Sequence, residues 1–369
     1  MRILYMLNTL VIGGAERLVL ALGERMAARG HSVRIVALGK ERPDEWPTDL
    51  NLIRLGMDRH PVHALSGVVQ GARALRDFRP HIVHSHNFHG NMMARALLLT
   101  RRSTRVISTL HNEYEGGTAR MFALKLTDFL SKKSVAVSQA VAERALQLGI
   151  VPREKCHVIL NGIDIASLTP DEERRSTLRS AMGAGRDFIW LSAGRLVPAK
   201  DYSNLLLAFS QVHLAEPETQ LWIAGDGSAE YVASLRIKTA QLRLEQVVHW
   251  LGGRRDVSAL LDAADAFALG SAWEGMPLAI AEAMAMEKPV VATGVGGVSE
   301  LIGPCGLVVP PRDPNALARA MLSMINTPPS ARGFLGKSAR QRIIDDFNIE
   351  RKADEWEALY QDIAGRTLE

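Results

Sequence analysis

Residues 274–282 read EGMPLAIAE and place two carboxylates, Glu274 and Glu282, eight positions apart. Gly275 and Pro277 indicate a turn, and proline suits the first position of a helix because its missing N–H would be unpaired there. Good helix-forming residues follow from Leu278, so Glu282 should lie on a helix and Glu274 on the loop before it. Free N–H groups at a helix start attract anions. The segment therefore suits a ligand that carries phosphates and hydroxyls, although a surface helix with two solvated glutamates would show the same pattern.

On both sides of this segment, short apolar runs alternate with helical patterns, which predicts parallel sheets built from βαβ units. Because 369 residues exceed one ordinary core, we predict two doubly wound, Rossmann-like α/β domains facing a cleft. The polar stretch 161–186 should link them, and 349–363 should form a final helix anchored by Trp356, Leu359 and Tyr360. The expected strands are 2–7, 32–37, 50–54, 82–84, 105–109, 134–137 and 156–159, then 188–193, 220–224, 247–250, 266–269, 290–292 and 307–309.

The composition, 47% hydrophobic and 23% charged, is that of a soluble globular protein. Two cysteines without metal-ligand spacing favour a reducing, cytoplasmic compartment. No run of about 20 residues is apolar enough to span a bilayer, so we do not expect an integral membrane protein. The apolar start of the chain is interpreted as a first strand because Asn8 and Thr9 interrupt it and no cleavage site follows.

The net charge of +4 is unevenly distributed. Residues 1–160 hold 23 Lys and Arg against 13 Asp and Glu, whereas the rest holds 21 against 27. A basic first half suggests an anionic partner. The segments 92–105 and 120–133 mix apolar residues with Arg and Lys at helical spacing, as interfacial helices do, and core-facing amphipathic helices would do so too. Nucleic acid is disfavoured because the basic stretches lack interleaved aromatic residues.

Two glycine-containing loops could hold phosphate groups. Gly13 and Gly14 lie between the first strand and a helical pattern, where glycine lets backbone approach a phosphate or simply forms a tight turn. They do not form the G-x-G-x-x-G fingerprint, so a NAD-dependent oxidoreductase loses its main support. Arg195 and Lys200 follow the first strand of the second half and could neutralise a diphosphate leaving group, or could belong to a solvated loop.

Two further strands end in turns of the kind that line a nucleotide. Gly225 and Asp226 end one, and the backbone around Arg254 could edge a nucleobase, although a turn into a helix capped near Asp256 explains the same residues.

Histidines cluster after two strands of the first half. His84, His86 and His89 lack a carboxylate or cysteine at familiar spacing, which disfavours zinc. The chain also lacks an Asp-x-Asp motif that would bind a metal to a sugar nucleotide. His111, directly after the next strand, is the polar-site candidate of this half.

In order and spacing, these residues resemble the GT-B glycosyltransferases, specifically the large retaining family GT4, over almost the whole chain. The matching motifs are Gly13-Gly14, Thr109-Leu110-His111, Val137-Ser138, Asn161-Gly162-Ile163-Asp164, Gly194-Arg195-Leu196 with Lys200, Ala224-Gly225-Asp226-Gly227, the E-x7-E of Glu274 and Glu282, Gly296-Gly297 with Glu300, and Gly306 to Pro310.

The resemblance implies a role for each candidate residue. Arg195 and Lys200 would bind the donor diphosphate, with N–H groups near Gly14 assisting. Glu282 would take the ribose hydroxyls and Glu274 would face the sugar. His111 would lie near the anomeric centre and the sugar's 6-hydroxyl. The backbone N–H groups of the loop would meet the sugar or phosphates; this loop comprises Gly275, Met276, Pro277 and Leu278.

The family transfers sugar with retention and without a bound metal or other cofactor. Domain closure would assemble the site, with acceptor-binding residues 1–165 joined by the final helix 346–369, and a nucleotide-sugar domain at 166–345. The donor is expected to be a UDP-sugar more than GDP-mannose. The acceptor should be a lipid-linked or polysaccharide intermediate of the bacterial cell surface, with peripheral contact to the inner face of an anionic membrane. A non-catalytic nucleotide-sugar-binding subunit and a GT-B nucleotide-sugar epimerase are the alternatives.

Overall fold

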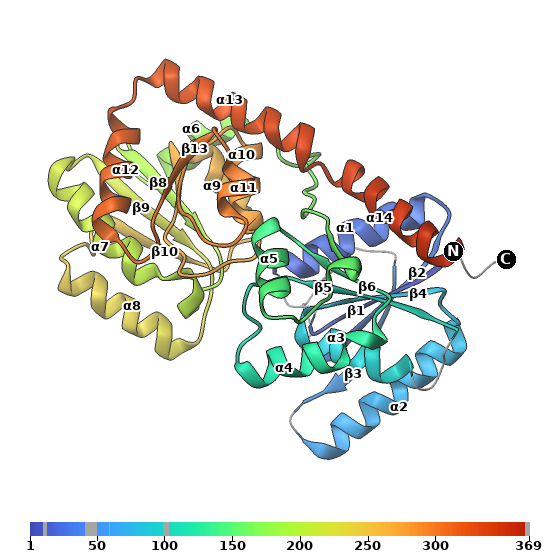
Figure 1. Cartoon of the computed structure of the whole chain (residues 1–369). Helices are drawn as coiled ribbons and strands as arrows, with labels where there is room; N and C mark the ends of the chain where they lie inside the picture. Colours follow the sequence, from blue (N-terminus) through green and yellow to red (C-terminus); the bar gives the residue numbers. More distant parts are fainter. Residues whose placement is uncertain (10–12, 41–49, 59, 99–102, 366–369) are drawn as a thin grey trace. The chain divides into compact units, whose positions relative to one another are not determined.

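A computed structural model describes residues 1–9, 13–40, 50–58, 60–98 and 103–365 (Figure 1). Its internal contacts divide the chain into two units. The first comprises Met1–Gly162 with Ile349–Glu369, and the second comprises Ile163–Asn348. The boundaries expected from the sequence, 165/166 and 345/346, lie three residues away from these.

The first unit contains a parallel sheet of seven strands in the order β3-β2-β1-β4-β5-β6-β7. Its strands are β1 Arg2–Leu7, β2 Ser32–Gly39, β3 Asn51–Met57, β4 Ile82–His86, β5 Arg105–Leu110, β6 Lys133–Ala136 and β7 Cys156–Val158. Its helices are α1 Gly14–Ala28, α2 Pro61–Phe78, α3 Asn87–Leu97, α4 Thr118–Thr127, η2 Asp128–Leu130, α5 Gln139–Gln147, η3 Arg153–Lys155 and α14 Ile349–Gly365.

Helices cover both faces of this sheet because its strands are apolar on both sides. Ile3, Tyr5 and Leu7 of β1 pack with α1 and α14 in one buried cluster. Leu4 and Met6 point to the opposite face and pack with α2 and α3. This alternation along one strand is the period of two that places successive side chains on opposite faces.

The second unit contains a parallel sheet of six strands in the order β10-β9-β8-β11-β12-β13. Its strands are β8 Phe188–Ala193, β9 Thr219–Ala224, β10 Val248–Gly252, β11 Ala266–Leu269, β12 Val290–Thr293 and β13 Gly306–Val309. Its helices are α6 Glu172–Ala181, η4 Pro198–Lys200, α7 Tyr202–Ala215, α8 Ala229–Gln241, α9 Val257–Ala263, α10 Leu278–Ala285, α11 Val298–Ile302, α12 Pro314–Asn326 and α13 Pro329–Asp346.

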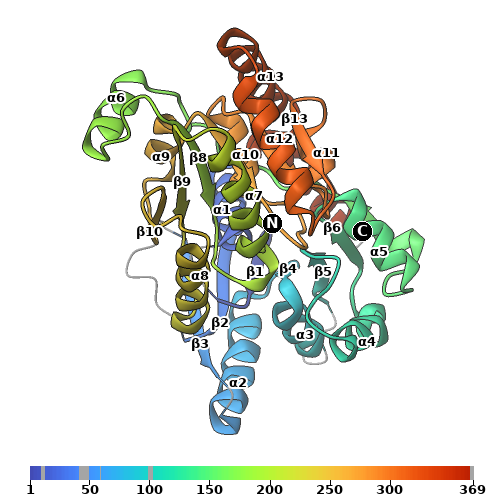
Figure 2. The same cartoon turned by 90° about the vertical axis from the view of Figure 1, so that its left-hand side faces the viewer.

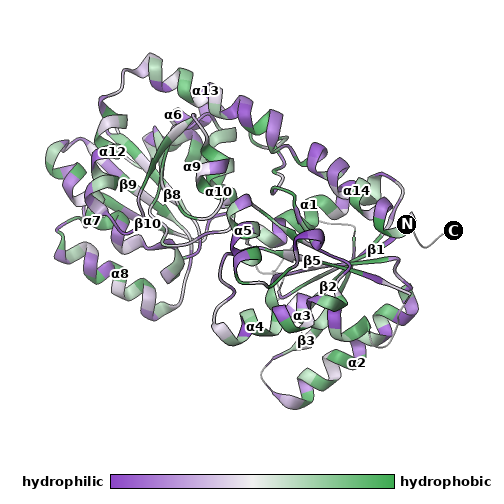
Figure 3. Ribbon diagram, in the orientation of Figure 1, coloured by the Kyte–Doolittle hydropathy of each residue, from purple (hydrophilic) through white to green (hydrophobic). Residues whose placement is uncertain are grey.

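Helices α7 and α12 pack against each other beside this sheet (Figure 2). Trp190 of β8 and Leu221 of β9 contribute to the buried cluster beneath them, together with Phe209 of α7 and Met321 of α12. Figure 3 shows hydrophobic residues along β8 and β9, whereas α13 carries many hydrophilic ones. Two parallel sheets, each with interleaved helices, confirm the predicted two-domain α/β architecture.

The prediction of a linker over 161–186 was wrong, because residues 172–181 form helix α6 and pack on α9. Arg175 donates to Asp265 at 2.6 Å, and Arg179 donates to the same carboxylate at 3.1 Å. Arg174 bonds to Asp262, whose side chain is buried. The charges that suggested a solvated linker therefore neutralise carboxylates on helix α9 and on the loop between α9 and β11.

Most strand boundaries agree with the sequence prediction within two residues; the largest difference is β3, which ends three residues later than expected. The final helix forms as predicted, belongs to the first unit, and buries its three predicted anchors Trp356, Leu359 and Tyr360. Among the described residues, no helix combines the length and apolar character needed to cross a membrane.

Candidate active site

The predicted donor residues of the second unit lie at the carboxyl ends of β8, β9, β10 and β11. Backbone bonds join three of these ends, from Gly194 N–H to the Ala224 carbonyl at 2.9 Å and from Gly225 N–H to the Gly252 carbonyl at 2.8 Å. Gly225 has a φ of +154°, and a Cβ atom there would lie 1.8 Å from the Gly194 oxygen. Only glycine can occupy this position, because the backbones of two loops are in direct contact there. The loops after these strands therefore lie together at one edge of the sheet.

Lys200 and Glu274 meet at this edge. The Lys200 ammonium donates to Glu274 Oε1 at 2.6 Å, and the Ser271 hydroxyl donates to the same oxygen at 2.7 Å. The two charged side chains are only 15% and 11% exposed. The Ala272 N–H also donates to the Ala199 carbonyl at 2.8 Å, which holds the two loops side by side. The pair thus presents a cation and a carboxylate together, as a ligand with phosphates and hydroxyls requires.

A second glycine loop supports the backbone at Glu274. The Gly297 N–H donates to the Gly275 carbonyl at 2.6 Å, and a Cβ atom on Gly296 would lie 2.2 Å from the Glu274 carbonyl oxygen. Thr293 at the end of β12 donates to the Ser271 carbonyl at 2.6 Å. The loop carrying Glu274 is therefore fixed from the neighbouring strand, which restricts where its carboxylate can point.

Helix α10 begins at Leu278, and Pro277 is its N-cap residue. The sequence predicted Pro277 as the first residue of the helix, so the helix begins one position later than expected. Met276 and Gly275 are buried in the turn before it. Glu282 lies on α10, partly exposed, one turn beyond Leu278. The E-x7-E segment thus has the predicted division into a loop carboxylate and a helix carboxylate.

Three other predicted residues lie in exposed loops at the same edge. Arg195 and Asp226 are exposed. Arg254 forms a fork with Asp256, at 2.8 Å from Nε and 2.6 Å from a terminal nitrogen, and this pairing lowers the pKa of the Asp256 carboxyl. Asp256 is the N-cap residue of α9, but its carboxylate binds Arg254 and makes no capping bond.

In the first unit, Gly13 is the N-cap residue of α1 with extended backbone, and Gly14 is the exposed first residue of the helix. Residues 10–12 of this loop lie outside the described residues. His111 directly follows β5 and is 8% exposed. Burial lowers the pKa of its imidazole to about 4, so the ring is neutral at physiological pH.

His84 and His86 form a buried polar network beside His111, which was not predicted from the sequence. His84 Nδ1 and Nε2 contact the hydroxyls of Tyr360 and Thr109 at 2.6 and 2.7 Å. His86 Nδ1 lies 3.0 Å from His111 Nε2. The i, i+2 spacing of His84 and His86 on a strand could have indicated a shared face.

His89 is exposed and contacts Asn8 at 3.4 Å. No group of three His, Cys, Asp or Glu able to hold a metal ion is found among the described residues. Catalysis without a metal stays a prediction.

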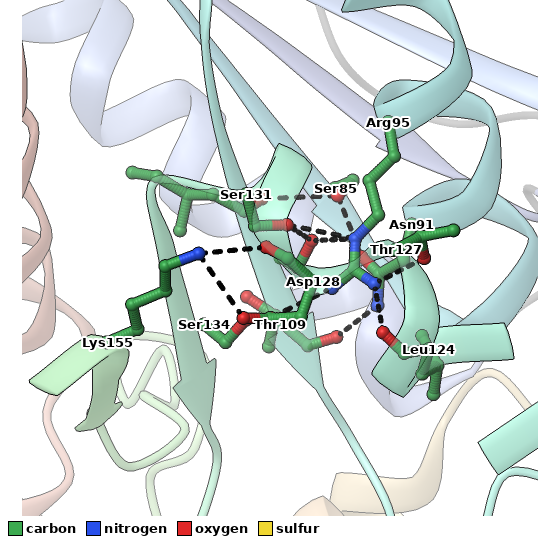
Figure 4. A network of polar contacts seen from close by, with 12 residues as sticks. Ser85, Asn91, Arg95, Thr109, Leu124, Thr127, Asp128, Ser131, Ser134 and Lys155 are labelled. Carbon is green, nitrogen blue, oxygen red and sulfur yellow. Dashed lines mark hydrogen bonds and ion pairs between the residues drawn. The ribbon is translucent and has the colours of Figure 1, made fainter. Parts of the chain in front are cut away.

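In the segment 92–105, one of the two segments that could be interfacial helices, Arg95 faces the core, and Arg101 and Arg102 lie outside the described residues. Arg95 of α3 is 1% exposed and lies inside the first unit, where it donates to Ser131 at 2.9 Å and to the Leu124 carbonyl at 2.8 Å (Figure 4). Asp128 is its carboxylate partner at 3.5 Å. Burial lowers the pKa of this guanidinium to about 10. A cation satisfied by buried oxygens is unavailable to a membrane surface.

Comparison with known proteins gives the same assignment in both halves of the chain. A family model described as glycosyltransferase family 4 matches residues 12–167, and one described as glycosyl transferases group 1 matches residues 187–327. A galactosyltransferase of Escherichia coli, named for UDP-Gal and α-D-GlcNAc-diphosphoundecaprenol, is 26% identical over 76% of this chain and 75% of its own. A glycogen synthase of Mycobacterium tuberculosis is 27% identical over 95% of this chain and 91% of its own.

Among solved structures, HepE from Anabaena in complex with UDP and glucose superposes with a TM-score of 0.88 at 22% identity, covering 98% of this chain and 100% of that one. This likeness, together with the two sheets, defines the class of protein: a two-domain α/β fold of the GT-B type. The chain belongs to the group 1 glycosyltransferases of family GT4 and is a hexosyltransferase.

Proposed function

We propose that this enzyme transfers a hexose or an N-acetylhexosamine from a UDP-sugar, with retention of configuration and without a bound metal. The arrangement of Lys200 and Glu274 at the glycine-lined strand ends is the observation that carries the proposal. The names of two similar proteins support the choice of nucleotide, since one uses UDP-Gal and the other was solved with UDP and glucose.

Each residue then has one task. Lys200 and Arg195 neutralise the diphosphate as the bond to the sugar breaks, which is charge stabilisation where charge develops. Glu274 accepts hydrogen bonds from sugar hydroxyls, Glu282 accepts them from the ribose, and His111 contributes a neutral imidazole to the sugar. Because no residue is required as a covalent nucleophile, positioning and electrostatics supply the rate.

The experiment is a melting-temperature screen of the protein with UDP, GDP, ADP and their common sugar conjugates, in the presence of a chelator. A ligand that binds only the folded state raises the melting temperature with concentration. We expect UDP and one or more UDP-sugars to raise it. A shift with GDP alone would mean that the donor is a GDP-sugar and not a UDP-sugar. No shift with any nucleotide would contradict the proposed site. The configuration of the transferred sugar, determined by NMR once an acceptor is found, tests retention.

For the acceptor, we propose a lipid-linked or polysaccharide intermediate of the cell surface, reached at an anionic membrane. The E. coli relative is named for a diphosphoundecaprenol acceptor. In the first unit, Phe122 and Leu126 of α4 and Phe129 of η2 are 65%, 63% and 75% exposed. Exposed Lys125 and Lys132 accompany them. We call these five residues the α4 surface.

The α4 surface has the composition of a membrane-binding face, because apolar side chains can enter the acyl boundary while lysines meet anionic headgroups. The only carboxylate between residues 116 and 133 is Asp128, which is buried against Arg95. No exposed negative charge in this segment therefore opposes an anionic lipid.

A further inference from the structure

His86 and His111 are placed side by side by the register of two central strands. His86 is the last residue of β4 and pairs with Thr109 of β5. His111 follows Thr109 by two positions, and its Nε2 atom lies 3.0 Å from His86 Nδ1. Both rings are removed from solvent, His86 completely. At this distance one nitrogen donates its proton and the other accepts.

The surroundings of His86 decide the direction of this bond. Its Nε2 atom is buried and has no hydrogen-bond partner among the described residues. A buried N–H without an acceptor is rarer and more costly than a buried lone pair without a donor. The proton of neutral His86 therefore belongs on Nδ1, where it has an acceptor. Burial also lowers the pKa of both rings, so both are neutral at physiological pH.

We infer that His86 is a positioning residue: its Nδ1–H donates to His111 Nε2 and thereby fixes His111 in the tautomer that carries its proton on Nδ1. His111 then acts on the sugar as a hydrogen-bond donor from Nδ1. This second step rests on the proposed function of His111, whereas the tautomer itself does not.

Two substitutions of equal shape distinguish the effect of losing the Nδ1–H donor of His86 from the effect of losing the volume of its ring. In asparagine the amide nitrogen is as many bonds from the backbone as Nδ1 is in histidine, so His86→Asn can keep the donor. His86→Leu has the same branching without a donor. Both remove the same amount of ring, so any loss of packing is shared.

The first measurement is ¹⁵N NMR of the full-length protein labelled at histidine, with the His111 signals assigned through their absence in His111→Asn. Protonated and bare ring nitrogens have distinct shifts. We expect His111 to be protonated at Nδ1 in the wild type and in His86→Asn, and to become a mixture of tautomers in His86→Leu. Protonation of His111 at Nε2 in the wild type, or the same mixture in both variants, would overturn the inference.

The second measurement is the affinity for UDP-glucose relative to UDP, by titration calorimetry. In His86→Leu, the affinity for UDP-glucose relative to UDP should fall about tenfold, which is the value of one hydrogen bond. The affinity of this variant for UDP itself should be unchanged. His86→Asn should retain the relative affinity of the wild type. Equal losses in both variants would reduce His86 to a packing role. A wild type that binds no UDP would refute the proposed donor instead and leave the NMR result standing.

Discussion

Lys200 and Glu274 are 74 positions apart in the sequence, yet their charged atoms lie 2.6 Å from each other. We predict that Lys200→Ala lowers the rate of UDP release from the donor at least about a hundredfold, the usual effect of removing one donor that stabilises transition-state charge. The same substitution should lower the melting temperature without ligand, because Glu274 would keep a poorly solvated charge without its partner.

The double variant Lys200→Ala/Glu274→Gln separates these two effects. It removes the unpaired charge, so the melting temperature without ligand should return toward that of the wild type, while the rate of UDP release stays low. Near-normal UDP release by Lys200→Ala would refute the assigned role of the lysine. Recovery of the rate of UDP release in the double variant would show that the unpaired Glu274, rather than the lost cation, slowed the reaction.

At this scale the sequence indicated which residue types belong to the site, and the structure shows how they pair. Lys200 and Glu274 were assigned from separate motifs, but their contact depends on a backbone bond between two loops. Arg254 was assigned to the substrate, and the structure pairs it with a carboxylate two residues away. His86 was considered from the sequence only as a zinc ligand, and zinc was disfavoured. Its position beside His111 follows from the register of β4 and β5, which is not visible in a local sequence pattern.

Among the elements, α4 and η2 carry the prediction about the membrane. Replacing Phe122 and Phe129 by serine should abolish cosedimentation with phosphatidylglycerol vesicles, since an exposed phenylalanine gains roughly 1.5–3 kcal/mol when fully buried. Salt should also release the wild type, because its lysines act through screened charge. Phe334→Ser is the matched control, as Phe334 is 75% exposed on α13 of the second unit. Salt-independent binding, or equal loss in the control, would contradict docking through the α4 surface.

Helix α6 lies in the stretch 161–186, which was predicted from the sequence to be a linker. Its mean composition is strongly polar, and Arg174, Arg175 and Arg179 would suit a solvated segment equally well. What makes it a packed helix is Asp262 and Asp265, about 90 positions away, whose carboxylates need cationic partners. Long-range charge pairing leaves no periodic apolar signal, whereas α14 was predicted correctly because Trp356 and Tyr360 recur at helical spacing.

At the scale of the whole molecule, the two-unit architecture could be predicted because each sheet gives a strong local signal. A strand such as β8, buried on both faces, is continuous apolar sequence, and a helix must follow before the next parallel strand. The packing of α14 with α1 in the first unit joins the two ends of the chain. It was expected only from the family resemblance, because no local pattern specifies a contact over such a separation.

The histidines also distinguish the two units in their response to acid. His84, His86 and His111 all lie in the core of the first unit, and burial lowers their pKa values below 6.5 in the folded state. The unfolded chain binds protons near pH 6.5, so the stabilisation is complete above that pH and is lost as the pH falls below it. Each of these rings should therefore lower the free energy of unfolding as the pH falls from roughly 7.5 to 5.5.

We therefore predict that the first unit loses more stability than the second unit over this range, because of these three rings. Hydrogen exchange measured at each pH, followed on peptides of β4 and β5 and of β8 and β11, gives the stability of each unit separately. In His86→Leu, one of these three rings is no longer present to take up a proton on unfolding, so the acid-dependent loss in the first unit should be smaller, even though the variant is less stable at every pH. An unchanged pH dependence in that variant would mean that His86 takes up no extra proton on unfolding over this range, which would contradict a neutral His86 ring in the folded core.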